Sequence, residues 1–334
     1  MFEVGKSHLS GCGAMVYPAN SILVVDGSPF GRSLSLLPAM KLIREAYPRA
    51  FLAVAASTGV CELLLNASLV TETIDLGVIR PAAETSFKRV VRLIRNARRF
   101  DFDLVVDFAP KPETQFLSRL VLRARTITPS RLPLVIEFLT GAGLRRGGDR
   151  APDYESVLRK LGLEAGGNRI AITPTPEDNA RFEELLARNG SRGGEPVVVL
   201  YTAGGADAWP VASFAEIAQR LAGNFNARVV PADEPGDQTF TSALEALLPK
   251  TAIKLAEPRA LALMAAVARA SVLITDERNL AAVASGMGTP VIDVAGLAGA
   301  HSLRGPQISV TTDEVYEEAC EILQESRSAG LFRR

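Results

Sequence analysis

The chain has 334 residues, and its 37 lysines and arginines are balanced by 37 aspartates and glutamates. Hydrophobic residues make up 47% and charged residues 22%, which excludes a disordered or fibrous chain. Three cysteines without a CxxC pair and two histidines are too few for a disulfide framework or a histidine-rich metal centre. Because a domain commonly holds about 150 residues, we expect two globular domains.

No apolar run in the sequence reaches the roughly 20 residues that span a bilayer. The first twenty residues lack the apolar segment and cleavage pattern of a signal peptide. These two observations predict a cytoplasmic protein.

The zero net charge hides a division between the two halves of the chain. Residues 1–175 carry 23 lysines and arginines against 16 acidic residues, and the remainder is acidic by the same margin. Six of the basic residues crowd the segment 86–100, which fits either a solvated helix face or attraction to an anionic membrane surface or acidic acceptor. The apolar segment 132–139 is the second candidate for peripheral contact with the inner face of a membrane. No aromatic residues interleave with the basic ones, so nucleic acid is not an expected partner.

The first half alternates strand-like and helix-like segments. Short apolar runs rich in β-branched residues predict strands, and apolar residues at helical spacing predict helices between them. The predicted strands are 22–27, 51–57 and 102–110, and the predicted helices are 32–48, 59–66 and 114–125.

The second half repeats this plan after a region rich in glycine and proline, 140–195. Strands are predicted at 195–205, 228–233, 271–276 and 289–296, and helices at 179–190, 214–223, 241–249, 260–270 and 279–288. Alternation of this kind predicts an α/β protein with two Rossmann-type, doubly wound domains that face each other across a cleft. We expect an N-terminal arm (1–20), a first domain (21–170) and a second domain (171–334).

No strong catalytic motif stands out. The dinucleotide fingerprint GxGxxG, the P-loop and the GxSxG elbow are all absent from the sequence. The turn between Gly27 and Gly31 follows the first strand and could present backbone N–H groups to an anion, or could be only a tight connection. His301 lies in a loop after the last core strand, which should face the cleft.

Several segments in order resemble glycosyltransferase family 9, the ADP-heptose:lipopolysaccharide heptosyltransferases. The first strand and turn run into a helix with the pair Pro38-Ala39 and then the sequence Ala-Tyr-Pro (46–48). The segment 201–222 contains a Trp-Pro-x-x-x-Phe pattern that begins at Trp209, and 284–306 is similar to the stretch that closes the family's nucleotide-binding domain.

The resemblance implies a GT-B fold, with the acceptor on the first domain and the sugar nucleotide on the second. It also implies a metal-independent, inverting transfer of a heptose or similar sugar to a cell-surface glycan or glycolipid. No cofactor is implied, because the nucleotide sugar, ADP-linked in the family, is the substrate. The positions that the resemblance assigns to nucleotide binding are Gly31, Thr202, Gly204, Gly205, Trp209, Asp237, Asp276, Glu277 and Asn279.

The chain departs from the family pattern at its reactive positions. Arg32 stands where the family has an aspartate base, and a guanidinium cannot accept a proton. Asp207 stands where a lysine would stabilise the leaving diphosphate. The segment 275–280 lacks the glycine and proline of the phosphate-binding turn. His301 is the first candidate for a substitute base, followed by Asp276 or Glu277.

The exchanged charges suggest a further hypothesis, that Arg32 and Asp207 pair across the cleft and hold the domains closed; alternatively, each points into solvent. Three functions stay open: an active glycosyltransferase with a changed site, an inactive relative that binds or scaffolds a protein partner, and an unrelated Rossmann-type protein such as an epimerase or dehydrogenase.

Overall fold

The computed structural model describes most of both predicted domains. The described residues are 17–77, 99–108, 125–128, 154–164, 172–204, 208–248, 252–255, 257, 259–295 and 310–328. In these ranges no helix has the length and apolar character needed to cross a membrane.

The first sheet has five parallel strands in the order β3-β2-β1-β4-β5. Hydrogen bonds pair β1 with both β2 and β4, so β1 is central. β1 and β2 are buried along almost their whole length, which explains their continuous apolar sequences. The strands are β1 (Ser21–Val25), β2 (Phe51–Ala56), β3 (Glu72–Asp75), β4 (Leu104–Asp107) and β5 (Arg125–Ile127).

Four described helices belong to this N-terminal lobe: α1 (Phe30–Ser33), α2 (Leu36–Ala46), α3 (Thr58–Asn66) and α8 (Tyr154–Lys160). The single helix predicted for 32–48 is therefore two helices. Ser35 separates them, and the second ends at Ala46, before Pro48. The strands β3 and β5 were missed, because both are short and only partly apolar.

The second sheet has four parallel strands in the order β7-β6-β8-β9. They are β6 (Val197–Tyr201), β7 (Arg228–Ala232), β8 (Val272–Thr275) and β9 (Val291–Asp293). Each lies inside a predicted strand segment. Nearly every residue of β6, β7 and β8 is buried, as expected for a sheet with helices on both faces.

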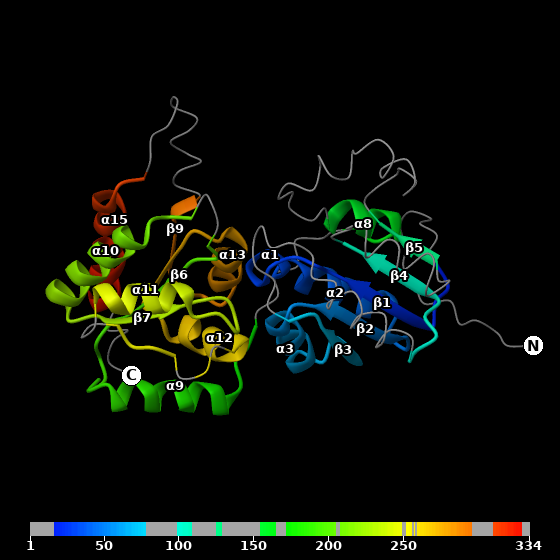
Figure 1. Cartoon of the computed structure of the whole chain (residues 1–334), viewed down its shortest axis with the longest axis horizontal. Helices are drawn as coiled ribbons and strands as arrows, with labels where there is room; N and C mark the ends of the chain where they lie inside the picture. The colour runs from blue at the N-terminus through cyan, green and yellow to red at the C-terminus, as the bar shows by residue number, and fades with distance from the viewer. Residues whose placement is uncertain are drawn as a thin grey trace, which may run out of the picture.

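The helices of this C-terminal lobe surround the sheet (Figure 1). They are α9 (Pro176–Arg188), α10 (Val211–Phe225), α11 (Thr239–Leu247), α12 (Ala260–Arg269), α13 (Arg278–Gly286) and α15 (Thr312–Ser328). The last helix was not predicted from the sequence. The two parallel sheets confirm the predicted α/β fold class, whereas the domain limits 21–170 and 171–334 stay predictions.

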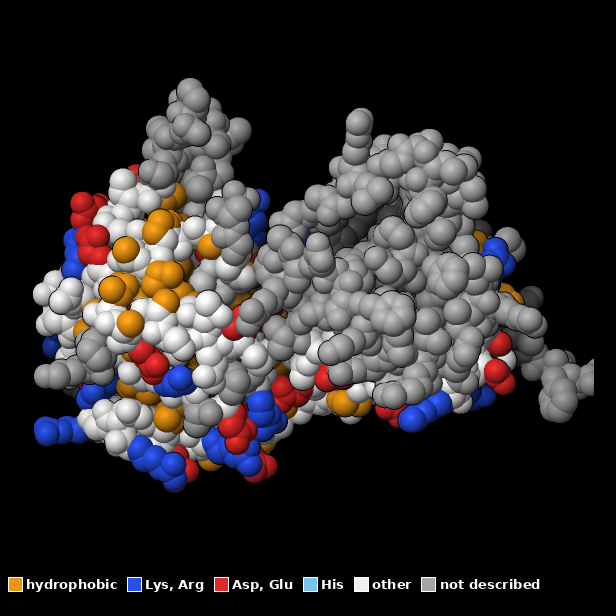
Figure 2. All heavy atoms as spheres, in the orientation of Figure 1, with side chains coloured by type: hydrophobic (Ala, Val, Ile, Leu, Met, Phe, Trp, Pro, Cys, Tyr) orange, Lys and Arg blue, Asp and Glu red, His pale blue; other side chains and the backbone are white. Residues whose placement is uncertain are grey.

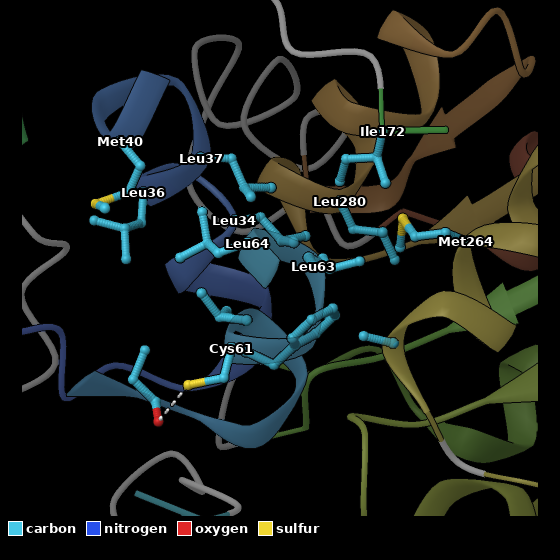
Figure 3. Close-up of a cluster of buried hydrophobic side chains, with 14 of the residues drawn as sticks. Leu34, Leu36, Leu37, Met40, Cys61, Leu63, Leu64, Ile172, Met264 and Leu280 are labelled. Carbon is cyan, nitrogen blue, oxygen red and sulfur yellow. Dashed lines mark hydrogen bonds between the residues drawn. The ribbon is translucent and has the colours of Figure 1, made fainter. Parts of the chain in front are cut away.

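The lobes meet along a seam, formed by α1 and α3 on one side and by α12 and α13 on the other (Figure 1). Figure 3 shows that leucines of the N-terminal lobe point toward Met264 and Leu280 of the C-terminal lobe. Leu34, Leu63, Met264 and Leu280 are at most 1% exposed and belong to one continuous cluster. The two lobes thus share a hydrophobic core at the seam.

Side chains of both charges are mixed over the described part of the face in Figure 2. Most of the basic segment 86–100 and all of the apolar segment 132–139 lie outside the described residues. Peripheral membrane contact therefore stays a prediction.

Candidate functional site

The turn after β1 meets the C-terminal lobe through the backbone of Gly31. The Gly31 amide donates a hydrogen bond of 3.4 Å to Oε1 of Glu234, in the loop after β7. Glu277, in the loop after β8, packs against the same glycine, because a Cβ added at Gly31 would lie 2.6 Å from its Cγ. Glycine is therefore required here by the close approach of the Glu277 side chain. Where the sequence predicts a cleft, the two lobes touch.

Glu277 also caps the helix that follows it. Its Oε1 accepts hydrogen bonds from the Asn279 backbone N–H (3.1 Å) and from Nδ2 of Asn279 (3.0 Å) at the start of α13. The Asn279 side chain reaches across the seam, where its Oδ1 accepts a bond of 2.7 Å from Oγ of Ser35. The N-terminus of α13, the predicted phosphate site, thus already has a carboxylate at its first turn.

Asp276 organises the loop after β6. Its Oδ2 accepts hydrogen bonds from Oγ1 of Thr202 (2.8 Å) and from the Trp209 amide (2.9 Å). Oγ1 of Thr202 in turn accepts a bond from the amide of Gly204, which has a left-handed backbone (φ 70°). Thr202, Gly204, Trp209 and Asp276 therefore do lie together. Asp276 holds the Thr202 hydroxyl and the Trp209 amide, which gives it a structural role.

Burial changes the acidity of these carboxyl groups. Burial raises the pKa of Glu234 to about 8, and the nearby charges of Glu277 and Asp237 add to this effect. Burial also raises the pKa of Asp276 and of Glu277, although the Arg32 guanidinium lowers that of Glu277. A diphosphate placed between these groups would meet negative or protonated carboxyls instead of cations.

The end of β6 contributes a fully buried tyrosine to this cluster. The Tyr201 hydroxyl has no hydrogen-bond partner among the described residues. Burial raises the pKa of Tyr201, and so do the carboxylates of Glu234, Glu277 and Asp276. The phenol therefore stays protonated beside the acidic groups.

An open pocket of about 300 Å³, its mouth included, lies next to this cluster, at the end of β7. Asp237 lines it, and its Oδ1 accepts bonds from the Gln238 and Thr239 amides at the start of α11 (2.8 and 3.2 Å). Lys254 and Arg259 also line the pocket, together with the apolar side chains Pro231, Leu255 and Leu263. Asp233 is a second acidic residue of the lining, so the pocket offers apolar surface, two carboxylates and two cations.

Arg259 ties the pocket to the other lobe. Its Nη2 and Nε donate to Oε1 of Glu62, on α3, at 2.7 and 2.9 Å. Oε2 of Glu62 accepts a bond of 2.9 Å from the amide of Ala260, the first residue of α12. Glu62 thus pairs with a cation and caps a helix of the opposite lobe at once. We call this contact the clasp.

In the N-terminal lobe, a buried carboxylate follows the central strand β1. Asp26 is fully buried, and it accepts hydrogen bonds from the Ser28 amide (2.9 Å) and the Tyr154 hydroxyl (2.6 Å). The same hydroxyl lies 3.4 Å from the Arg32 carbonyl oxygen. Asp26 and Tyr154 therefore shape the turn that carries Gly31 and Arg32.

The structure tests only part of the predicted site. His301, Asp207 and Gly205 lie outside the described residues, so the substitute base and the pairing of Arg32 with Asp207 stay predictions. The ring of Trp209 packs edge-on against Phe214, with centroids 4.8 Å apart, and ligand stacking stays a prediction. Among the described side chains, no group of three or more His, Cys, Asp or Glu is placed to hold a metal ion.

Sequence reasoning missed Asp26, Tyr154, Glu62 and Arg259. A signal existed for Asp26, because a carboxylate directly after a buried central strand lies at the ligand-binding edge of the sheet. For Glu62 and Arg259 there was none, since their contact depends on how the two lobes pack.

Comparisons with known proteins place the fold. The scan against family models gives no match, and the search of curated proteins gives none. A family 9 glycosyl transferase from Veillonella parvula aligns over 94% of this chain and 99% of its own, at 17% identity and a TM-score of 0.65. ADP-heptose LPS heptosyltransferase II from E. coli aligns over 92% and 99%, at 16% identity and a TM-score of 0.59.

Other nucleotide-sugar proteins share the same architecture. A protein assigned as a UDP-N-acetylglucosamine 2-epimerase from Listeria monocytogenes aligns over 93% of this chain and 90% of its own, at 12% identity and a TM-score of 0.50. The higher scores belong to the family 9 enzymes, the family that the sequence resembles. The chain therefore has the GT-B fold of the family 9 glycosyltransferases.

Proposed function

We propose that this protein is a glycosyltransferase that moves a sugar from a nucleoside diphosphate to a glycan or glycolipid acceptor. The observation that carries the proposal is the GT-B fold with an open polar pocket at the carboxyl edge of the second sheet. Ligands of open α/β sheets bind at this edge. By the resemblance, the donor is ADP-linked and carries a heptose or similar sugar.

The pocket is the proposed seat of the nucleoside. Leu255 and Leu263 offer an apolar surface to the base, and Asp237 offers a carboxylate to the ribose hydroxyls. Lys254 supplies positive charge for the phosphates. The carboxylates after β8 cannot supply it. The donor would thus enter from the side of β7.

In the transfer, an acceptor oxygen attacks the anomeric carbon while the bond to the diphosphate breaks and the leaving group keeps the bonding electrons. A base takes the proton of the acceptor hydroxyl. His301 is the proposed base, with Asp276 and Glu277 as alternatives. Asp276 and Glu277 each already accept two hydrogen bonds, so both rank behind His301. Arg32 cannot be the base, and its charge suits a developing anion.

Calorimetric titration with ADP, an ADP-sugar, UDP, GDP and CMP tests the proposal. We expect micromolar binding of one diphosphate and about tenfold weaker binding by Asp237→Ala, the loss of about one hydrogen bond to a charged group. Asp313→Ala, on the exposed start of α15, is the control and should bind like the wild type. Failure of all five nucleotides would contradict the proposal and favour a binding or scaffold subunit.

A further inference from the structure

The carboxyl groups at the seam have a role that the transfer reaction does not require. Glu234 is 5% exposed, and its carboxyl group accepts a hydrogen bond from the backbone of Gly31 in the opposite lobe. Glu277 lies on the other side of the same glycine. Two acidic side chains of one lobe thus converge on a single backbone position of the other.

This convergence closes the seam at the N-terminus of α13, which the diphosphate of a donor bound on the side of β7 would have to reach. One backbone amide there, that of Asn279, already donates to the Glu277 carboxylate. The Asn279 side chain is held by Ser35 of the opposite lobe. A phosphate would have to displace the Glu277 carboxyl and part the lobes at Gly31.

We propose that Glu234 and Glu277 form a carboxyl plug, which closes the seam over Gly31 at low pH and releases it when both groups are ionised. The plug would act as a gate on donor binding, and this part rests on the proposed function. A neutral Glu234 accepts the Gly31 amide bond without repelling Glu277. An ionised Glu234 places a second negative charge in a buried contact, which favours separation of the lobes.

The groups around the plug determine the direction of this pH effect. Asp237 faces Glu234 from the start of α11, and Asp276 faces Glu277 from its own loop; both disfavour ionisation. Arg32, on α1, favours an ionised Glu277 and thus opposes the uptake of a proton by this group of the plug. Asp233 and the protonated Tyr201 lie behind the cluster. Because burial and the charges of Glu277 and Asp237 raise the pKa of Glu234, this is the group whose ionisation drives release.

Hydrogen–deuterium exchange of the segment 28–37, corrected for the intrinsic pH dependence of exchange, tests the plug. Because the Glu234 carboxyl releases its proton near pH 8 instead of near 4.5, we expect wild-type protection to fall by up to about tenfold per pH unit within this window. Glu234→Gln, an isostere of the protonated acid, should stay protected at pH 9. Glu234→Ala should be unprotected even at pH 6.

A matched control is Glu184→Gln, which neutralises an exposed carboxylate of α9 and should follow the wild type. Wild-type protection that does not change with pH, or a Glu234→Gln curve that matches the wild type, would overturn the plug. Because the Gln and Ala variants move protection in opposite directions, a folding defect in one of them leaves the other as a test.

Adding ADP separates this inference from the proposed function. If protection falls with pH but ADP neither binds nor alters exchange at any pH, the plug stands and nucleotide binding fails. If ADP binds equally at pH 6 and pH 9 and the protection of residues 28–37 does not change with pH, the plug fails and the proposed function stands. The two proposals together predict tighter ADP binding at pH 9.

Discussion

Two of the polar contacts that join the lobes, the clasp and the plug, differ in charge balance. In the clasp, Glu62 meets Arg259, so an ionised carboxylate has a cation and a helix N-terminus as partners. In the plug, Glu234 and Glu277 meet the uncharged backbone of Gly31. The clasp gives its carboxylate a cationic partner, whereas burial and the neighbouring acidic groups favour a proton on Glu234 in the plug.

This difference explains how the seam can stay closed at one end and respond to pH at the other. An arginine stays protonated at every pH at which the protein is folded, so the cation of the clasp is constant. The apolar core between α3 and α12 lies beside the clasp and holds that end of the seam together. The end at Gly31 carries Glu234, whose carboxyl group changes charge near pH 8.

The largest effect is expected from the shared apolar core. Leu63→Ala removes a side chain that is 1% exposed and faces the seam, which should lower the free energy of unfolding by about 2–5 kcal/mol. Leu65→Ala, on the same helix but 48% exposed, is the control and should change it by less than about 0.5 kcal/mol. Urea denaturation measures both. Equal effects would mean that the lobes do not share a core.

Next in size is the close approach at the plug. Gly31→Ala forces a Cβ to within 2.6 Å of Glu277, so we expect a loss of about 1–3 kcal/mol. Gly223→Ala, in α10, meets no atom within 4 Å and should be stabilising by about 0.5–1 kcal/mol. Thermal unfolding of the two variants compares them. A neutral Gly31→Ala would show that Glu277 does not press on the turn.

A smaller effect is expected from the clasp. Glu62→Ala removes the cap of α12 and the partner of Arg259, and should cost about 0.5–2 kcal/mol, because Arg259 is 40% exposed. The loss should be the same at pH 6 and pH 9, in contrast to changes at Glu234. Glu183→Ala, which breaks the exposed pair with Arg269, should cost less than about 1 kcal/mol. A loss for Glu62→Ala that varied with pH in this range would remove the distinction between clasp and plug.

The sequence predicted what depends on local pattern. Apolar runs in the sequence indicate the buried strands around Val24, Val199 and Ile274. The alternation of these strands with helices predicts parallel sheets. Short partly exposed strands such as β3 carry no comparable signal. Thr202 and Asp276 were predicted only as separate positions of the family resemblance, and the structure brings their side chains to 2.8 Å.

The contacts of the seam could not be predicted in this way. Glu62 is one of several acids on amphipathic helices, and its role appears only when α12 approaches α3. Likewise, nothing in the sequence around Glu234 indicated that its side chain would be buried against Gly31. Such contacts depend on the rigid-body placement of two lobes, which no periodicity encodes.

The central claim is that Glu234 keeps its proton in the closed seam, and the pH dependence of stability tests it most directly. The unfolded chain releases this proton near pH 4.5 and the folded chain near 8, so between these values the folded state binds one more proton and loses stability as the pH rises. Urea unfolding from pH 5 to pH 9 should show wild type declining by up to about 1.4 kcal/mol per pH unit relative to Glu234→Gln, and levelling near pH 8. Two parallel curves would contradict the claim.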